Sequence, residues 1–160
     1  MYRIGIGSDI HRLIEGRPLV IGGVQIDSDL GADGHSDADV LCHALCDAIL
    51  GALSLGDLGK HFPADEERWR NAESFIFLRY VVGLMKQSGY RVANVDSTVH
   101  LEKPKLRPYI DEMKKGIGEV LEIEANCVSV KAKTGEGVDA VGELRAVRAD
   151  AVVSLTKIET

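Results

Sequence analysis

The sequence predicts an α/β (α+β) fold: a single domain over residues 1–160 in which helices pack on one face of a sheet. Apolar residues alternate at the period of a strand in some segments and recur at the period of a helix in others, and the two kinds are interleaved. This order is typical of a layered sheet with helices. The 160 residues, 45% of them hydrophobic, suffice for one core, and no repeat divides them.

Two short strands are predicted first, at residues 2–7 and 19–26. Gly22 and Gly23 interrupt the second, which predicts a hairpin or a bulge there. The polar, glycine-containing segment Asp27–Gly34 is predicted as a loop.

Three helices are predicted next. The first should begin at Ser36, because Asp39 stands three residues later as in an acidic variant of the capping box. The second covers residues 71–88 and ends at glycine, and the third begins near Pro108, a residue suited to a first helical turn.

The remaining strands are predicted at residues 92–101, 128–133 and 145–157. A helix is an alternative for 145–157, whose residues are not all strong strand formers. The alternation of apolar and polar residues there favours a strand.

Charge and cysteine content restrict the partners and the compartment. The net charge of −6 argues against binding to nucleic acid or acidic membranes, which requires clustered Lys and Arg. The odd number of cysteines, Cys42, Cys46 and Cys127, favours reduced thiols. With no secretory pattern at the start and no 18-residue apolar stretch, we expect a soluble, untargeted, cytoplasmic protein.

A metal site is the first chemical hypothesis. Asp9 and His11 stand two apart after the first strand, so extended backbone would point both side chains the same way. With His43 from the first helix they offer a carboxylate and two imidazoles, a set typical of catalytic zinc with one position open. Asp47, one turn from His43, is expected to orient its ring. The alternative is a turn cap and two ordinary histidines, with Asp39 and Asp47 on a solvated helix face.

Gly34-His35-Ser36 runs into the predicted start of the first helix, where free N–H groups favour an anion. These residues are therefore candidates for holding a phosphate. The alternative is that Ser36 only caps the helix.

Two further segments combine polar groups with glycine or with a strand end. Asp57 lies between Gly56 and Gly59, where backbone and carboxylate can approach a ligand closely, although a simple turn fits as well. The segment Lys131–Glu136 has donors for phosphate, and Glu136 is a candidate ligand for a hard cation such as Mg²⁺. A solvated strand end is the alternative.

Six segments in this order resemble the methylerythritol cyclodiphosphate synthase family, from Arg3 to at least Glu136. Six ordered matches are far more specific than any one alone. The segments are Arg3–His11, Gly34–Val40, His43–Ala48, Leu55–Gly59, Asn94–Asp96 and Lys131–Thr134.

The resemblance implies a reaction and an assembly. The reaction converts 4-diphosphocytidyl-2-C-methyl-D-erythritol 2-phosphate to 2-C-methyl-D-erythritol 2,4-cyclodiphosphate and CMP, in the non-mevalonate isoprenoid pathway, and the enzyme is a phosphorus-oxygen lyase. The assembly is a homotrimer with active sites between subunits, each subunit a mixed four-stranded sheet with helices on one face plus a small hairpin.

The resemblance also implies a role for each matching residue. Asp9, His11 and His43 match zinc ligands, and Glu136 matches a carboxylate near a second cation, Mg²⁺ or Mn²⁺. Substrate-binding positions are His35 and Ser36 for phosphate, Asp57, Leu58 and Gly59 for hydroxyls, and, from a neighbouring subunit, Pro104, Lys105, Leu106, Ala132, Lys133 and Thr134 for cytidine. The catalytic set is His35, Asp57, Lys133 and Thr134.

The chain departs from the family at two places. Ala64 and Asp65 follow Phe62-Pro63 where many members have an aspartate first, and the stretch 138–145 lacks a glycine-rich run associated with isoprenoid diphosphate binding at the trimer axis. Two other functions stay open: a metal-dependent phosphohydrolase, and a metal- or nucleotide-binding subunit without activity.

Overall fold

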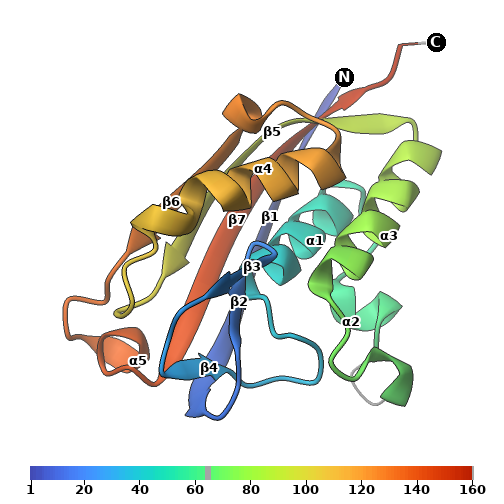
Figure 1. Ribbon diagram of the computed structural model, residues 1–160. Helices are drawn as coiled ribbons and strands as arrows, with labels where there is room; N and C mark the ends of the chain where they lie inside the picture. The colour runs from blue at the N-terminus through green and yellow to red at the C-terminus, as the bar shows by residue number, and fades with distance from the viewer. Residues whose placement is uncertain (64–65, 160) are drawn as a thin grey trace.

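The computed structural model describes residues 1–63 and 66–159, so Asp65 lies outside the described residues. Its longer helices and strands form one layer of helices on one mixed sheet (Figure 1). The helices are α1 (Val40–Ala52), α2 (Leu58–His61), α3 (Ser74–Gln87), α4 (Ile110–Leu121) and α5 (Asp139–Gly142). The strands are β1 (Tyr2–Glu15), β2 (Leu19–Ile21), β3 (Val24–Ile26), β4 (Leu30–Ala32), β5 (Tyr90–His100), β6 (Val128–Lys133) and β7 (Ala146–Lys157).

The main sheet has the order β4-β1-β7-β5-β6, and its pairs are antiparallel except β5–β6. The mixed sheet is therefore confirmed, with its four long strands joined by a short fifth one. That fifth strand, β4, lies inside Asp27–Gly34 and pairs with the end of β1. The prediction that Asp27–Gly34 is a loop throughout is therefore wrong. The predicted hairpin is confirmed as β2–β3, with Gly22 and Gly23 both at positive φ in its turn.

The strand predictions at residues 92–101, 128–133 and 145–157 are confirmed as β5, β6 and β7, so the helical alternative for the last is wrong. The first strand is longer than predicted and continues to Glu15. Residues 8–11, three of which are polar, lie beyond the predicted end of the strand. They stay extended because β1 pairs with β7 continuously from Tyr2 to Arg12.

The second predicted helix is confirmed as α3, and the third begins as a 3₁₀ turn, Arg107–Tyr109, that leads into α4. The start of the first helix was wrongly predicted. α1 begins at Val40, and its N-cap is Asp39 rather than Ser36. Ala38 has a φ of 55°, in the left-handed region, which prevents a helix from running through from Ser36.

Asp39 joins the helix to the hairpin. Its carboxylate is fully buried and accepts hydrogen bonds from four backbone N–H groups: Leu41 and Cys42 in the first turn of α1, and Gly22 and Gly23 in the β2–β3 turn, at 2.7–3.2 Å. The alternative that places Asp39 on a solvated helix face is therefore wrong. Four donors compensate for the loss of water around the carboxylate.

The helix α1 lies directly against β1 because two glycines leave no side chain between them. A Cβ atom on Gly5 would come within 1.8 Å of the Ala48 carbonyl oxygen, and one on Gly7 within 2.0 Å of the Ala44 carbonyl oxygen. Both distances are far inside van der Waals contact. The backbones therefore approach as closely as sterics permit. Beyond Gly7, the side chains of Asp9 and His11 face the first turns of α1.

The two faces of the sheet differ. The helices α1, α3 and α4 cover one face (Figure 1), and no helix among the described residues is long and apolar enough to span a membrane. On the other face, Ile4 and Ile6 of β1 are 74% and 72% exposed, and Tyr2, Ile10 and Val152 are exposed too. We call this set, Tyr2, Ile4, Ile6, Ile10 and Val152, the open apolar strip, and no element among the described residues covers it.

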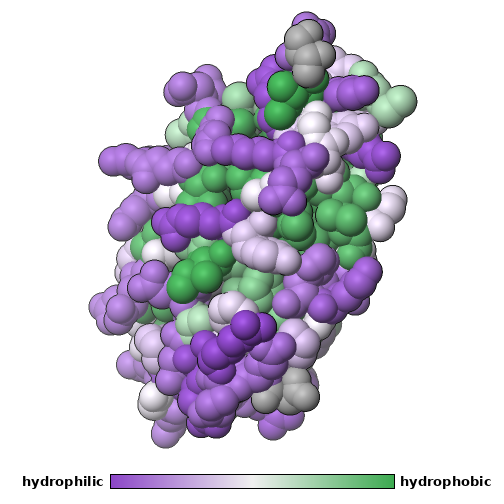
Figure 2. Space-filling view, turned by 90° about the vertical axis from the view of Figure 1, so that its right-hand side faces the viewer, coloured by the Kyte–Doolittle hydropathy of each residue, from purple (hydrophilic) through white to green (hydrophobic). Residues whose placement is uncertain are grey.

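The side of the molecule that carries α3 is seen in Figure 2. Apolar surface gathers in its upper half between hydrophilic side chains, and its lower half is mostly hydrophilic. On α3 itself, Ile76 and Tyr80 remain 46% and 47% exposed. The apolar surface on this side is therefore interrupted by polar groups.

We predict that Asp39→Ala lowers the free energy of unfolding by about 2–4 kcal/mol, because it removes a helix cap and leaves four backbone N–H groups, three of them in buried hydrogen bonds, without their acceptor. Urea unfolding followed by circular dichroism measures the change. The matched control is Asp29→Ala at an exposed position, expected to stay within about 0.5 kcal/mol of the parent. Equal stability of the two variants would contradict the role of Asp39.

Candidate metal centre

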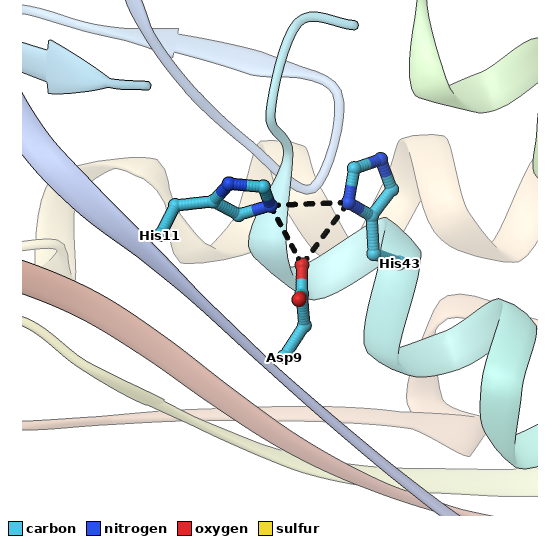
Figure 3. Close-up of side chains that lie close together, drawn as sticks. All are labelled: Asp9, His11 and His43. Atoms are coloured by element: carbon cyan, nitrogen blue, oxygen red, sulfur yellow. Dashed lines mark hydrogen bonds and ion pairs between the residues drawn. The ribbon is translucent and has the colours of Figure 1, made fainter. Parts of the chain in front are cut away.

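Asp9, His11 and His43 converge on one point between β1 and α1 (Figure 3). Asp9 Oδ2 lies 2.8 Å from His11 Nε2 and 3.0 Å from His43 Nδ1, and the two ring nitrogens are 3.3 Å apart. The sequence predicted this convergence, and it is confirmed. Three ligand atoms from a carboxylate and two imidazoles thus face one another and fit a single divalent metal ion.

The electrostatics of the three groups favour cation binding. Although burial alone would raise the pKa of Asp9, hydrogen bonds from His11 and His43 lower it to about 2. The carboxylate is therefore charged at neutral pH. Burial lowers the pKa of His11, but its hydrogen bond to Asp9 outweighs this and raises the pKa above its usual value. A negative centre surrounded by two imidazoles attracts either protons or a metal ion.

His11 is held by its other nitrogen. Its Nδ1 lies 2.7 Å from the carbonyl oxygen of Asp33, just after β4, and a carbonyl can only accept. Nδ1 therefore carries a proton, and Nε2, which donates to Asp9 in the metal-free chain, is the nitrogen whose lone pair would be available to a metal ion. This is the usual way in which a backbone carbonyl fixes the tautomer of a ligating histidine.

Asp47 does not orient His43, so that prediction is wrong. The Asp47 carboxylate accepts a hydrogen bond from the backbone N–H of Leu58 at 2.7 Å and fastens α2 to α1. His43 Nε2 instead lies 3.0 Å from Ser74 Oγ and 3.3 Å from Ser36 Oγ. Ser74 comes from the start of α3, 31 residues away in the chain, so helical spacing could not indicate it.

A pocket of about 190 Å³ opens beside the metal ligands. His35, Ser36, Leu58 and Gly59, four predicted substrate residues, line it together with His11 and His43. His35 Nε2 also lies 2.9 Å from the carbonyl oxygen of Glu66, which ties this segment to the next loop.

Asp57, also a predicted substrate and catalytic residue, caps α2 by accepting from the N–H of Lys60 at 2.9 Å. It does not line the 190 Å³ pocket itself. Sequence analysis missed the apolar wall of that pocket, formed by Phe62, Trp69 and Phe77. The sequence signal for this wall was the pair of aromatic residues, Phe62 and Trp69, on either side of the acidic segment 63–68.

The other predicted residues lie elsewhere in the chain. A second pocket, of about 630 Å³, has none of the metal ligands in its wall. Its lining includes Pro104, Lys105, Leu106, Ala132, Lys133 and Thr134. Glu136 contacts Thr134 Oγ1 at 3.2 Å and lines a smaller pocket beside His100, and among the described residues no three-ligand cluster includes it. Within one chain, the predicted site is thus divided between separate surfaces.

Comparison with known proteins identifies the family of the chain. The model of the YgbB family matches residues 2–156. The chain belongs to this family. A YgbB-type relative from Salinibacter ruber, named 2-C-methyl-D-erythritol 2,4-cyclodiphosphate synthase, is 53% identical over 96% of this chain and 98% of its own.

Solved structures of the YgbB fold match as well. The IspF–CDP complex from Plasmodium falciparum has a TM-score of 0.87 at 36% identity, covering 99% of this chain and 97% of that one. The bifunctional IspDF from Campylobacter jejuni has a TM-score of 0.95 at 34% identity. It covers 99% of this chain, which corresponds to 43% of the bifunctional protein.

We predict that His43→Ala loses the bound divalent metal and remains folded, because only two of three ligand atoms remain. Asp47→Asn should retain the metal at the parent level, since Asp47 bonds to Leu58 and not to His43. Elemental analysis of the purified proteins measures the content, and circular dichroism checks folding. Metal loss in Asp47→Asn alone would contradict the geometry described above.

Proposed function

We propose that this chain converts 4-diphosphocytidyl-2-C-methyl-D-erythritol 2-phosphate to 2-C-methyl-D-erythritol 2,4-cyclodiphosphate and CMP, as a phosphorus-oxygen lyase of the non-mevalonate isoprenoid pathway. The observation that carries the proposal is the Asp9–His11–His43 cluster beside a pocket lined by His35 and Ser36, in a chain 53% identical to a synthase of that name. Its three free thiols fit the proposed cytoplasmic location.

The metal in this proposal is zinc. Ligand atoms around a tetrahedral zinc ion with bonds of 2.0–2.2 Å stand about 3.3 Å apart. The three atoms here are separated by 2.8–3.3 Å, so they fit with small adjustments. Three protein ligands leave one position open for a phosphate oxygen, where zinc would supply positive charge as a Lewis acid.

The chain's own residues have to align two phosphates of one substrate. An oxygen of the 2-phosphate attacks the β-phosphorus, and the bond from that phosphorus to the oxygen of the departing CMP breaks. No protein nucleophile is required. His35 and Ser36 hold the phosphate beside the metal ligands, and Asp57 with Gly59 holds the hydroxyls of the methylerythritol. Good alignment of a tethered nucleophile alone reaches an effective molarity of ~10⁵ M or more.

Nucleotide binding is proposed for the 630 Å³ pocket of Pro104–Leu106 and Ala132–Thr134. The relative from Plasmodium falciparum is a complex with CDP, which supports a cytidine ligand in this fold. Lys133 would add fixed positive charge beside the diphosphate, and Thr134 a hydroxyl donor. Glu136, which already contacts Thr134, is the proposed ligand of a second cation, Mg²⁺ or Mn²⁺.

The proposed active form is a homotrimer with one site at each subunit interface. Two features support it. The metal pocket and the nucleotide pocket share no lining residue within one chain, which favours a site to which two subunits each contribute one of them. The open apolar strip on the sheet, with Ile4 and Ile6 more than 70% exposed, supplies the surface that such an assembly buries.

The test is one incubation of the zinc-loaded protein with the diphosphocytidyl substrate, read by phosphorus NMR. We predict that two coupled resonances of a cyclic diphosphate appear together with CMP, and that a chelator stops their formation. A noncyclic methylerythritol bisphosphate with CMP would indicate the phosphohydrolase instead. An unchanged substrate spectrum with bound nucleotide would indicate a subunit without activity.

A mixing experiment tests the shared site. Asp57→Ala and Thr134→Ala remove residues that the trimer model places on opposite sides of each interface. We predict that each variant alone is nearly inactive. A trimer with two subunits of one variant and one of the other keeps one intact interface, so about a third of one trimer's activity returns.

The two variants are refolded together and assayed for CMP release, and each is refolded alone as a control. Mass spectrometry verifies that mixed trimers form. Mixed trimers no more active than the controls would show that the two residues do not complete one site from different chains.

A further inference from the structure

His43 has two polar neighbours on the side that faces away from Asp9 and His11. Its Nδ1 belongs to the metal cluster, and its Nε2 lies 3.0 Å from Ser74 Oγ and 3.3 Å from Ser36 Oγ. The ring is only 12% exposed, so protein groups rather than bulk water determine which nitrogen carries the proton.

Ser74 is the first residue of α3, and it is 1% exposed. Its hydroxyl bonds to Asp37 Oδ1 in a short contact, and its backbone N–H donates to Asp37 Oδ2 at 2.9 Å. A carboxylate can only accept, so the hydroxyl proton of Ser74 points to Asp37. The lone pairs of Oγ then face His43, whose Nε2 must be the donor. Nδ1 shares its proton with Asp9 in the metal-free chain, and with Nε2–H fixed it is the Nδ1 lone pair that would be available to a metal ion.

Ser36 does not set this direction. Its oxygen accepts from the N–H of Ala38 at 3.2 Å, it is farther from His43 Nε2 than Ser74 is, and within residues 1–63 and 66–159 no carboxylate accepts its hydroxyl proton. Such a hydroxyl can donate to the ring or accept from it. Among the described contacts of Nε2, the one with Ser74 is therefore the one that selects the tautomer.

The segment that carries Asp37 is fixed to the approach of α3 by backbone hydrogen bonds. The N–H of Asn71 donates to the His35 carbonyl at 2.8 Å, and the N–H of Asp37 donates to the Ala72 carbonyl at 3.1 Å. Asp37 Oδ1 also accepts from the N–H of Asp39 at 3.1 Å. The carboxylate therefore has a fixed position relative to both α1 and α3.

From this geometry we infer that Ser74 and Asp37 form a hydrogen-bonded relay that positions His43 as a metal ligand. The inference rests on the proposed metal centre and names two residues that belong neither to the three-ligand cluster nor to the lining of the 190 Å³ pocket. In the relay, Asp37 accepts from Ser74 and Ser74 accepts from His43 Nε2–H, and the added electron density at Nδ1 would make this nitrogen a stronger ligand for a metal ion. Outer partners of this kind typically change metal affinity 10–100-fold when removed.

The experiment measures the dissociation constant of zinc for the full chain by competition with a chromophoric chelator. Ser74→Ala removes only the hydroxyl and keeps the N–H that bonds to Asp37. We expect a 10–100-fold rise in its dissociation constant. Ser74→Thr keeps a hydroxyl and is expected to recover most of the affinity, which a role in packing alone does not predict.

The matched control is Ser97→Ala. Ser97 is also buried, at 3% exposure, and its hydroxyl donates to the Ser129 carbonyl at 2.8 Å, within the sheet and outside the metal pocket. Its zinc affinity should stay within about twofold of the parent. Thermal unfolding of the metal-free proteins confirms that both alanine variants are folded.

Two results would overturn the inference, and they are distinguishable. If the parent binds zinc but Ser74→Ala binds it equally well, the relay has no role in metal binding and the proposed metal centre stands. If the parent itself binds no zinc, the metal centre and the relay fail together. A weakened Ser74→Ala beside an unchanged Ser97→Ala and a recovered Ser74→Thr supports the relay.

Discussion

The contact between α1 and β1 is the constraint on which the rest of the structure depends. Gly5 and Gly7 bring the strand within reach of the carbonyl groups of Ala44 and Ala48, with no side chain between. Because the backbones are this close, His43 on the helix reaches Asp9 and His11 on the strand. Any side chain at Gly7 would separate the two elements that supply the metal ligands.

The segment between β4 and α1 shows how an anion site can include acidic residues. Asp37 and Asp39 stand next to Ser36, yet each carboxylate is occupied: Asp39 by four backbone N–H groups, Asp37 by the N–H groups of Asp39 and Ser74 and by the Ser74 hydroxyl. Donors of the protein thus surround both charges. These hydrogen bonds replace water around the two carboxylates beside the proposed phosphate position, and they fix the loop.

The metal ligands were predictable from sequence because both periodicities that place them are local. Side chains two residues apart on an extended strand point to the same side, as those of Asp9 and His11 do. His43 lies on a helix that the spacing of its apolar residues predicts. The orientation of His43 was not predictable in this way. Asp47 lies one helical turn from His43, but its carboxylate accepts a hydrogen bond from the N–H of Leu58 instead. Ser74 comes from another helix and approaches His43 only in the folded chain.

The predicted boundaries of two elements were wrong for related reasons. Ser36 and Asp39 look like a cap and its partner, but the left-handed backbone of Ala38 delays the helix and turns Asp39 into the cap. The strand β4, three residues long, is too short to show a period, and it exists because β1 continues far enough to pair with it. In both cases tertiary contacts decided what local preference left open.

Side chains alternate along β1, so this one strand contributes both to the metal site and to the exposed face of the sheet. Its odd-numbered residues face the helices and include Gly5, Gly7, Asp9 and His11, and its even-numbered residues, such as Ile4 and Ile6, form the open apolar strip. Inserting or deleting one residue between Ile6 and Asp9 would place the metal ligands and the isoleucines on the same side of the sheet, so one of the two sets would face the wrong way. Substitutions can adjust either face separately, but a change in the length of this strand disrupts the relation between the two faces, so its residue count is constrained more tightly than its composition.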